Sequence, residues 1–328
     1  MKIGKKILLF MAFMSLAVAS SAQQLPLFSQ YLFNMYLVNP AVAGSDGYTS
    51  FNMTAREQWL GYSGAPRTYS FSYQTRLLKR SYIIKGSNVR RKSLKPSRDG
   101  KVGLGGYVFS DRNGLIHRTG VQATYSYHTW IYGGTQLSFG LSGTAFHFRI
   151  DEQNIRFEDP DDPILNSNLR QGVFIPDANF GVYVLNYRYN VGFSVEQLFQ
   201  SYVKLGNPGY KNLLLMRHYY LFGSYTFPFS SDSEIHPNFM FRMSEQLKPQ
   251  ADIGVKYTFK QDFWAGLSYR TGNIIITSVG ARFDNIYFGY AFDYSFSEIQ
   301  NYTYGSHEIM IAMKFGSSAR RYRWLDRY

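Results

Sequence analysis

The 328-residue sequence contains no cysteine, which excludes a disulfide framework, a cysteine-based zinc site and a thiol nucleophile. Charged residues make up only 17%, below the roughly 25% of typical soluble domains. Beyond the N-terminus, an apolar run of about 20 residues is missing, so a helical transporter is excluded. Abundant instead are aromatic residues, 28 Tyr and 27 Phe, together with a net charge of +13. This composition also excludes collagen, coiled coils and acidic disordered chains.

The N-terminus has the pattern of a secretory signal peptide. Three lysines precede an apolar run at 7–19, and Ser20 and Ala22 supply the small residues of a cleavage site. The run is too short for a membrane anchor, and no cysteine follows it for lipid attachment. We therefore expect the chain to be exported and residues 1–22 to be removed.

The rest of the chain alternates with a period of two. Large apolar side chains alternate with small or polar ones along 286–294, and the same pattern recurs at 121–128, 137–145 and 252–259. Successive side chains of a strand point to opposite faces. A soluble sandwich would bury the apolar face against a second sheet, whereas an outer-membrane barrel would turn it toward lipid. Small residues opposite large aromatics, in segments near the roughly 9–11 residues of a spanning strand, favour the barrel.

The pattern predicts an all-β transmembrane barrel of about fourteen antiparallel strands in the outer membrane of a Gram-negative cell, an even number as in single-chain bacterial barrels. The predicted strands are 48–59, 68–77, 102–111, 120–131, 135–150, 180–186, 189–197, 219–228, 235–244, 250–259, 263–270, 274–283, 286–294 and 306–315. This topology places both termini in the periplasm and makes periplasmic connections short. The exception is the connection 78–101, which is long.

The chain therefore divides into a signal peptide (1–22), an N-terminal segment (23–47), the barrel (48–315) and a basic periplasmic tail (316–328). Residues 25–43 are rich in Leu, Phe, Tyr and Val but do not alternate cleanly. An exposed apolar segment is unfavourable in the periplasm. We expect it to fold back into the lumen or the mouth as a plug, which would make the barrel a closed scaffold.

Positive charge is concentrated on one predicted face. The connection 76–101 carries +9 and the tail carries +3, and both are periplasmic in this topology. An acidic periplasmic protein or the headgroups of the inner leaflet are expected to bind there, and nucleic acid is not. A solvated loop without a specific partner is the alternative. The residues expected to bind are Arg80, Lys85, Arg90, Arg91, Lys92, Lys95, Arg98, Arg320, Arg321 and Arg323.

The predicted outward loop 151–163 carries the opposite charge. Prolines separate Asp159 from Asp161 and Asp162, and carboxylate oxygens are ligands that Ca²⁺ accepts. The run lacks the spacing and the glycine of an EF-hand loop. A proline-stiffened acidic loop is therefore the preferred interpretation, with a Ca²⁺ site as the alternative.

The sequence shows no catalytic motif. The six histidines lack metal-ligand spacing, and neither H-E-x-x-H nor G-x-S-x-G occurs. Arg56, Arg270 and Arg282 fall on lumen-facing positions, where we expect salt bridges. The sequence thus predicts a non-enzymatic protein without a cofactor, a metal or a small-molecule substrate. The alternative is a diffusion pore or a specific channel, with a lumen lined by residues such as Gln122, Thr124 and Arg282.

Five stretches, in order along the chain, carry a family resemblance. They are 24–44 with Phe28-Ser29-Gln30-Tyr31 and Asn39-Pro40, 56–68 with Gly64-Ala65-Pro66, the acidic run 159–163, 263–270 with its Phe-Trp-Ala-Gly start, and 290–309. Together they resemble the PorP/SprF family of outer-membrane proteins.

The resemblance implies a non-enzymatic barrel of the type IX secretion and gliding-motility apparatus. The implied partners are outer-membrane lipid, a secreted adhesin or its sorting domain at the surface, and periplasmic secretion or motor proteins. It implies structural roles for Phe28, Gln30, Tyr31, Asn39, Pro40, Gly64 and Pro66. Asn39-Pro40 would steer the N-terminal segment into the barrel, and Gly64 to Pro66 would form the first outward turn. The connection 76–101 is longer than the family pattern, so the resemblance assigns it no role.

Overall fold

The structure is a computed structural model that describes residues 28–77, 101–131, 134–150, 172–200, 202–203, 213–245 and 249–316. The long strands are β1 (Thr49–Glu57), β2 (Arg67–Leu77), β3 (Val102–Asn113), β4 (Ile116–Trp130), β5 (Gln136–Ile150), β6 (Val173–Leu185), β7 (Tyr189–Glu196), β10 (His218–Tyr225), β12 (Ser233–Ser244), β13 (Gln250–Phe259), β14 (Phe263–Arg270), β15 (Ile274–Phe283), β16 (Ile286–Ser295) and β17 (Ser306–Phe315). Three two-residue strands are β8 (Tyr202–Val203), β9 (Leu213–Leu214) and β11 (Phe227–Pro228). Short 3-10 helices are η1 (Met35–Leu37), η2 (Pro40–Val42) and η5 (Glu298–Tyr302). Within these described ranges, no helix is long and apolar enough to cross a bilayer.

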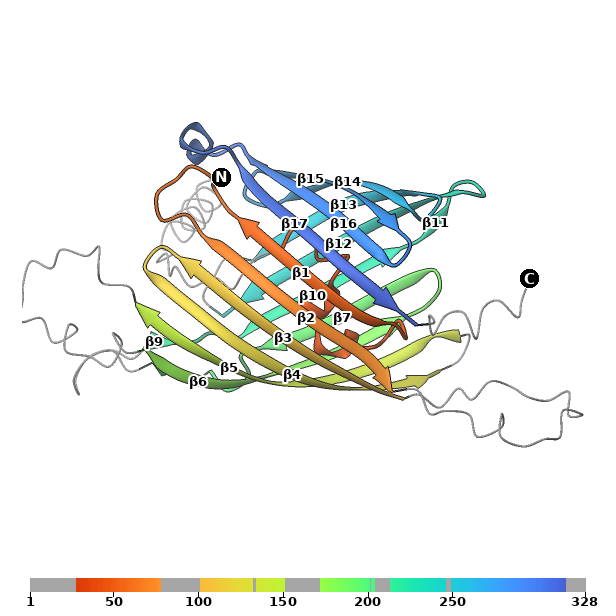
Figure 1. Cartoon of the computed structure of the whole chain (residues 1–328), viewed down its shortest axis with the longest axis horizontal. Helices are drawn as coiled ribbons and strands as arrows, with labels where there is room; N and C mark the ends of the chain where they lie inside the picture. Colours follow the sequence, from red (N-terminus) through yellow and green to blue (C-terminus); the bar gives the residue numbers. More distant parts are fainter. Residues whose placement is uncertain are drawn as a thin grey trace, which may run out of the picture.

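The fourteen long strands close into one antiparallel barrel (Figure 1). Each strand pairs with its neighbours in the chain, β10 pairs directly with β12, and β1 pairs with β17 from Thr49↔Phe315 to Glu57↔His307. Closure satisfies the backbone groups that an open sheet would expose to lipid. The pairing confirms the predicted fold and strand number.

The two faces of each strand are inverted relative to a soluble protein. In β1, Asn52 faces inward and is 2% exposed, while its neighbour Met53 is 58% exposed. The same holds in β5, where Ser142 is buried and Leu141 is exposed. An apolar exterior around a polar interior is the pattern of a membrane barrel. The soluble-sandwich alternative is therefore wrong.

Two predicted strands, β4 and β6, begin at least four residues earlier than expected. β4 starts at Ile116, because β3 and β4 form a tight hairpin in which Gly114 adopts a φ of 60°. β6 starts at Val173 and pairs with β5 from Phe148↔Val173 onward. Its Pro176, which lacks a backbone N–H, disfavours a strand when the sequence is considered alone. Pairing with a long neighbour overrides that local preference.

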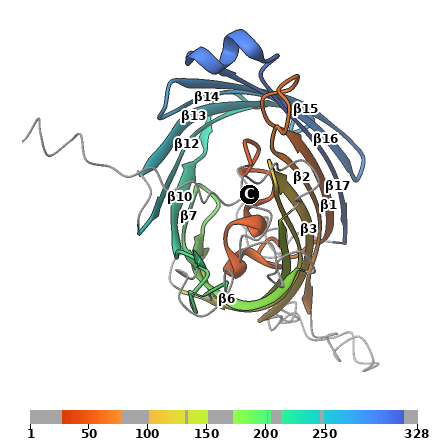
Figure 2. The same ribbon diagram turned by 90° about the vertical axis from the view of Figure 1, so that its left-hand side faces the viewer.

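The barrel has two distinguishable ends. The first, which we name the turn end, holds the tight connections 260–262 and 284–285, the start of β1 and the end of β17. The opposite end, which we name the loop end, holds the connections 58–66 and 296–305. A chain segment, 28–47, lies inside the barrel (Figure 2). Its hydrogen bonds place its start in the half of the barrel next to the loop end and its last residues at the turn end. We name it the lumenal segment.

The lumenal segment approaches the barrel wall closely at glycines. A Cβ atom added to Gly140 of β5 would lie 2.2 Å from the backbone nitrogen of Ala41. One added to Gly181 of β6 would lie 2.0 Å from the side-chain oxygen of Asn39. Both contacts are shorter than packed atoms allow. The sequence therefore leaves room at these two wall positions for the backbone of η2 and its cap.

We predict that Gly140→Val destabilises the protein, because its side chain would collide with η2. Overpacking of this kind lowers the free energy of unfolding by about 1–3 kcal/mol. Gly143→Val, in the same strand, is the matched control, because an added Cβ at Gly143 meets nothing within 4 Å. Urea unfolding of both variants in lipid vesicles measures the difference. Equal stability of the two variants would contradict the packing described here.

Candidate functional site

The start of the lumenal segment is held by two carboxylates of the wall. The backbone N–H groups of Ser29 and Gln30 donate to the two carboxylate oxygens of Glu308 in β17, at 2.7 and 2.9 Å. The Ser29 hydroxyl donates to Asp293 of β16 at 2.7 Å. Hydrogen bonds to a charged acceptor are about twice as strong as neutral ones. These bonds fix the segment in the loop half of the barrel.

These carboxylates belong to a buried lumen charge network of six side chains. Its members are Arg56, Arg242, Arg270, Asp252, Asp293 and Glu308, each at most a tenth exposed. Arg56 contacts Asp293 at 2.6 Å and Glu308 at 3.1 Å. Three cations balance three carboxylates. This balance is required because a buried charge without a partner is strongly destabilising.

Strand register brings the network together. Arg56 stands directly opposite Glu308 in the β1–β17 pair, and Asp252 stands opposite Arg270 in the β13–β14 pair. Arg270 reaches Asp252 at 2.9 Å and Asp293 at 3.4 Å, and thereby joins the two groups. The contacts confirm the salt bridges predicted for Arg56 and Arg270. Sequence reasoning placed Asp252 and Asp293 on polar strand faces but did not identify them as the partners.

Arg282 forms its ion pair elsewhere. It contacts Asp262 at 2.6 Å at the turn end, where both side chains are partly exposed. The pair is thus separate from the lumen charge network. Screening by solvent makes such an exposed pair worth little to stability.

The middle of the lumenal segment is bonded to strands on different sides of the barrel. Tyr31 donates to Asn238 at 3.0 Å, Asn34 donates to Ser72 at 2.9 Å, and Tyr36 shares a 2.8 Å bond with Thr124. The acceptors lie on β12, β2 and β4. The Tyr36 hydroxyl is thus a buried group with a hydrogen-bond partner on the wall.

Asn39 and Pro40 shape the turn of the segment at η2. The Asn39 side-chain oxygen accepts from the backbone N–H of Ala41 at 2.8 Å and so caps η2, whose first residue is Pro40. Its amide nitrogen donates to the carbonyls of Val182 and Phe193 at 3.0 and 3.2 Å. One side chain therefore caps the helix and joins it to β6 and β7.

The end of the segment is held at the turn end. The carbonyl of Ala43 accepts from the Ser126 hydroxyl at 2.6 Å and from His128 Nε2 at 2.9 Å. The carbonyl of Ser45 accepts from Arg76 at 3.4 Å. Arg76 is therefore a buried residue of β2, which corrects its assignment to the basic connection. The remaining connection, 78–101, carries +8.

The other residues of the predicted plug and turn motif also have defined places. Phe28 lines a small cavity in the loop half, and the Gln30 side chain donates to the Glu308 carbonyl at 3.2 Å. Gly64 lies in the β1–β2 connection with a φ of 73°, and the Pro66 carbonyl accepts from the Gln58 N–H at 2.9 Å.

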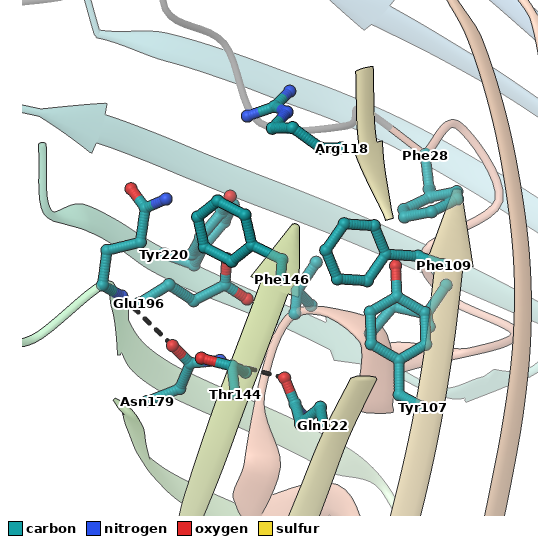
Figure 3. Close-up of a pocket in the computed structure, with 13 residues that line it drawn as sticks. Phe28, Tyr107, Phe109, Arg118, Gln122, Thr144, Phe146, Asn179, Glu196 and Tyr220 are labelled. Carbon is teal, nitrogen blue, oxygen red and sulfur yellow. Dashed lines mark hydrogen bonds between the residues drawn. The ribbon is translucent and has the colours of Figure 1, made fainter. Parts of the chain in front are cut away.

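Two cavities flank the lumenal segment. The cavity in the loop half measures about 70 Å³, with Phe109, Phe146 and Tyr220 in its wall (Figure 3). The cavity toward the turn end measures about 510 Å³. Ligand pockets for small molecules usually exceed about 300 Å³. Only the second of these two cavities has that size.

Several predicted features lie outside the described residues. They are the signal peptide, the acidic residues Asp159, Asp161 and Asp162, and the basic residues Arg80, Lys85, Arg90, Arg91, Lys92, Lys95, Arg98, Arg320, Arg321 and Arg323. Within the described part of the chain, no group of three or more His, Asp or Glu side chains is placed to hold a metal ion.

A family model described as type IX secretion system membrane protein PorP/SprF matches residues 20–313. The chain belongs to the PorP/SprF family. This assignment makes the protein a membrane component of type IX secretion, with the fold of an outer-membrane barrel. No curated protein matches the chain.

This PorP/SprF protein is also similar to solved outer-membrane barrels of low sequence identity. The toluene transporter TbuX of Ralstonia pickettii is 9% identical, with 85% of this chain and 92% of that chain covered and a TM-score of 0.47. Omp33 of Acinetobacter baumannii is 8% identical, with 83% and 100% covered and a TM-score of 0.41. The toluene transporter TodX of P. putida is 8% identical, with 85% and 93% covered and a TM-score of 0.44.

We predict that Asp293→Asn destabilises the barrel strongly, because it removes the carboxylate shared by Arg56, Arg270 and Ser29. Loss of one partner from a buried ion pair typically costs about 3–5 kcal/mol. Asp262→Asn removes a carboxylate of the same chemistry from the partly exposed pair with Arg282, and is expected to cost less than about 1 kcal/mol. Urea titrations compare the two. A larger loss for Asp262→Asn would refute the assigned role of the network.

Proposed function

We propose that this PorP/SprF protein is a closed, non-enzymatic scaffold of type IX secretion and gliding motility. It binds a secreted protein or a surface adhesin at its outer end and secretion or motor components in the periplasm. The observation that carries the proposal is the lumenal segment 28–47, which is bonded to the wall from the lumen charge network to the turn end. A barrel held shut in this way serves as an attachment point and not as a conduit.

The hydrogen bonds of the segment support a closed lumen. They run to strands on different sides of the barrel, and most of their donors and acceptors are buried. A buried polar group that loses its partner costs about 1–3 kcal/mol. Displacing the segment would break many such bonds together, so thermal opening is expected to be rare.

The loop end offers a surface suited to a protein partner. Connections 58–66 and 296–305 are joined by backbone bonds, from Leu60 to Gly305 and from Tyr304 to Leu60, both 2.8 Å. Tyr302 and Tyr304 are 74% and 76% exposed on this joined pair of connections. Tyrosine is enriched in protein interfaces. By the rule for even-stranded barrels this end faces outward, where a secreted protein would bind.

The two segments that follow the strand ends at the turn end are rich in basic residues in the sequence. The basic connection 78–101 follows β2, and the tail, which carries +3, follows β17. Both β2 and β17 end at the turn end, which faces the periplasm by the same rule. A positive surface attracts acidic partners and accelerates their association. This charge supports docking of an acidic periplasmic component.

The first prediction of this proposal concerns conductance. In planar bilayers, we expect the intact protein to show no large steady conductance, because the lumenal segment blocks the path through the loop half of the barrel. A variant lacking residues 29–43 should conduct, provided that its heat-modifiable gel mobility shows an assembled barrel. Large steady steps from the intact protein would defeat the closed-scaffold proposal.

The second prediction concerns the basic connection. Deleting residues 79–100 should abolish co-purification of periplasmic partners in mild detergent, as measured by mass spectrometry, while the barrel still assembles. Replacing Arg90, Arg91 and Lys92 by Glu should have the same effect, because it reverses the attraction.

The matched control exchanges Arg and Lys at the same three positions, which keeps the charge. It should retain the partners. Unchanged co-purification in the glutamate variant would argue against docking through this connection.

A further inference from the structure

The cavity of about 510 Å³ toward the turn end, which we name the vestibule, is a site to which the scaffold proposal assigns no role. The lumenal segment contributes Leu32, Phe33 and Met35 to its lining. The vestibule extends to Gln261, an exposed residue of the β13–β14 turn, so among the described residues it reaches the surface at the turn end. A small molecule can therefore enter without passing the segment.

Aromatic rings form one side of the vestibule. The rings of Phe33 and Trp264 lie 4.4 Å apart, and Tyr287 follows at 6.4 Å from Trp264. The ammonium group of Lys256 lies 5.0 Å from the centre of the Phe33 ring, within the range of a cation–π contact. A flat apolar surface thus meets a cation at its edge, and the two carboxylates of the same lining, Asp46 and Glu234, contact Lys314 and His236.

The same wall carries buried polar atoms without a partner. Trp264 is 6% exposed, and its indole N–H has no hydrogen-bond partner among the described residues. The same is true of the Thr258 hydroxyl, and Thr258 stands directly opposite Trp264 in the β13–β14 pair. An indole N–H can only donate. Both residues line the vestibule, and neither group gives up a hydrogen bond to another described residue when it meets an acceptor on a ligand.

The position of Lys256 completes the arrangement. It lies two residues before Thr258 on β13 and therefore on the same lumen face. Because Thr258 stands opposite Trp264, Lys256 is diagonal to Trp264 across the two strands. Residues at diagonal positions on paired strands are about 7–8 Å apart. One small ligand can therefore extend from the ring of Trp264 to Lys256.

We propose that the vestibule binds a small anionic amphiphile, with an aromatic or apolar body against Phe33 and Trp264 and an anionic head toward Lys256. The volume is in the range of about 300–1,000 Å³ that is usual for such sites. The ligand is held, not transported, because the lumenal segment lies between the vestibule and the loop end. The inference does not depend on the identity of the protein partners.

Calorimetric titration of the whole protein in a non-ionic detergent tests this site, with 2-naphthoate as the probe and 2-naphthol as its uncharged counterpart. We expect naphthoate to bind and naphthol to bind at least tenfold more weakly. Lys256→Met should remove this preference for the anion, and Trp264→Phe, which keeps a ring but removes the N–H, should weaken naphthoate binding several-fold.

Lys260→Met is the matched control, since Lys260 lies on the exposed β13–β14 turn and outside the vestibule lining. Its naphthoate affinity should equal that of the unaltered protein. Heat-modifiable gel mobility confirms that each variant is folded. The proposal would be overturned if naphthoate did not bind or if naphthol bound with equal affinity. It would also be overturned if Lys256→Met and Lys260→Met lowered the affinity for naphthoate equally.

Discussion

The contact between Arg56 and Glu308 is the interaction on which the architecture depends. The two residues face each other across the seam where the first strand meets the last. The carboxylate of Glu308 also accepts the backbone N–H groups of Ser29 and Gln30. Barrel closure and placement of the lumenal segment therefore share one buried anion. Because such a group is tolerated only when its partners are present, a barrel without the segment loses part of what stabilises its own seam.

A barrel of this width has an interior that its own side chains do not fill, and its inward faces are largely polar. The lumenal segment supplies the missing apolar material. Tyr36, Val38 and Ala41 form a buried cluster with Tyr183 and Phe222 of the wall. Hydrogen bonds from the wall then satisfy backbone carbonyls of the segment, as Ser194 does at Val38 and Ser126 does at Ala43. The core of this protein is therefore a chain segment inside a polar cylinder, with lipid contacts left to the exterior.

The barrel could be predicted from single strands, because the alternation of apolar and polar residues within one strand shows which of its faces meets lipid. Arg56 and Arg270 were predictable as lumen residues for the same reason. Their partners depend on register between strands that lie far apart in sequence, such as β1 and β17, and no local pattern encodes that register. The start of β6 could not be predicted, because Pro176 lies in it and proline disfavours a strand. The strand forms there because it pairs with β5, which the local sequence does not show. The vestibule was equally inaccessible to sequence reasoning, because Phe33 and Trp264 are 231 positions apart and meet only through the fold.

The lumen differs between its two halves, and this difference connects the two proposals, the closed scaffold and ligand binding in the vestibule. The loop half holds the charge network and little free volume, whereas the turn half holds the vestibule. Phe33 lies four residues from Ser29, so one short stretch of chain contacts both regions. A ligand that binds only when Phe33 is in place stabilises that arrangement by mass action. Occupancy of the vestibule would then strengthen the anchoring of the segment at the seam, and the turn end of the barrel would influence how firmly its lumen is closed.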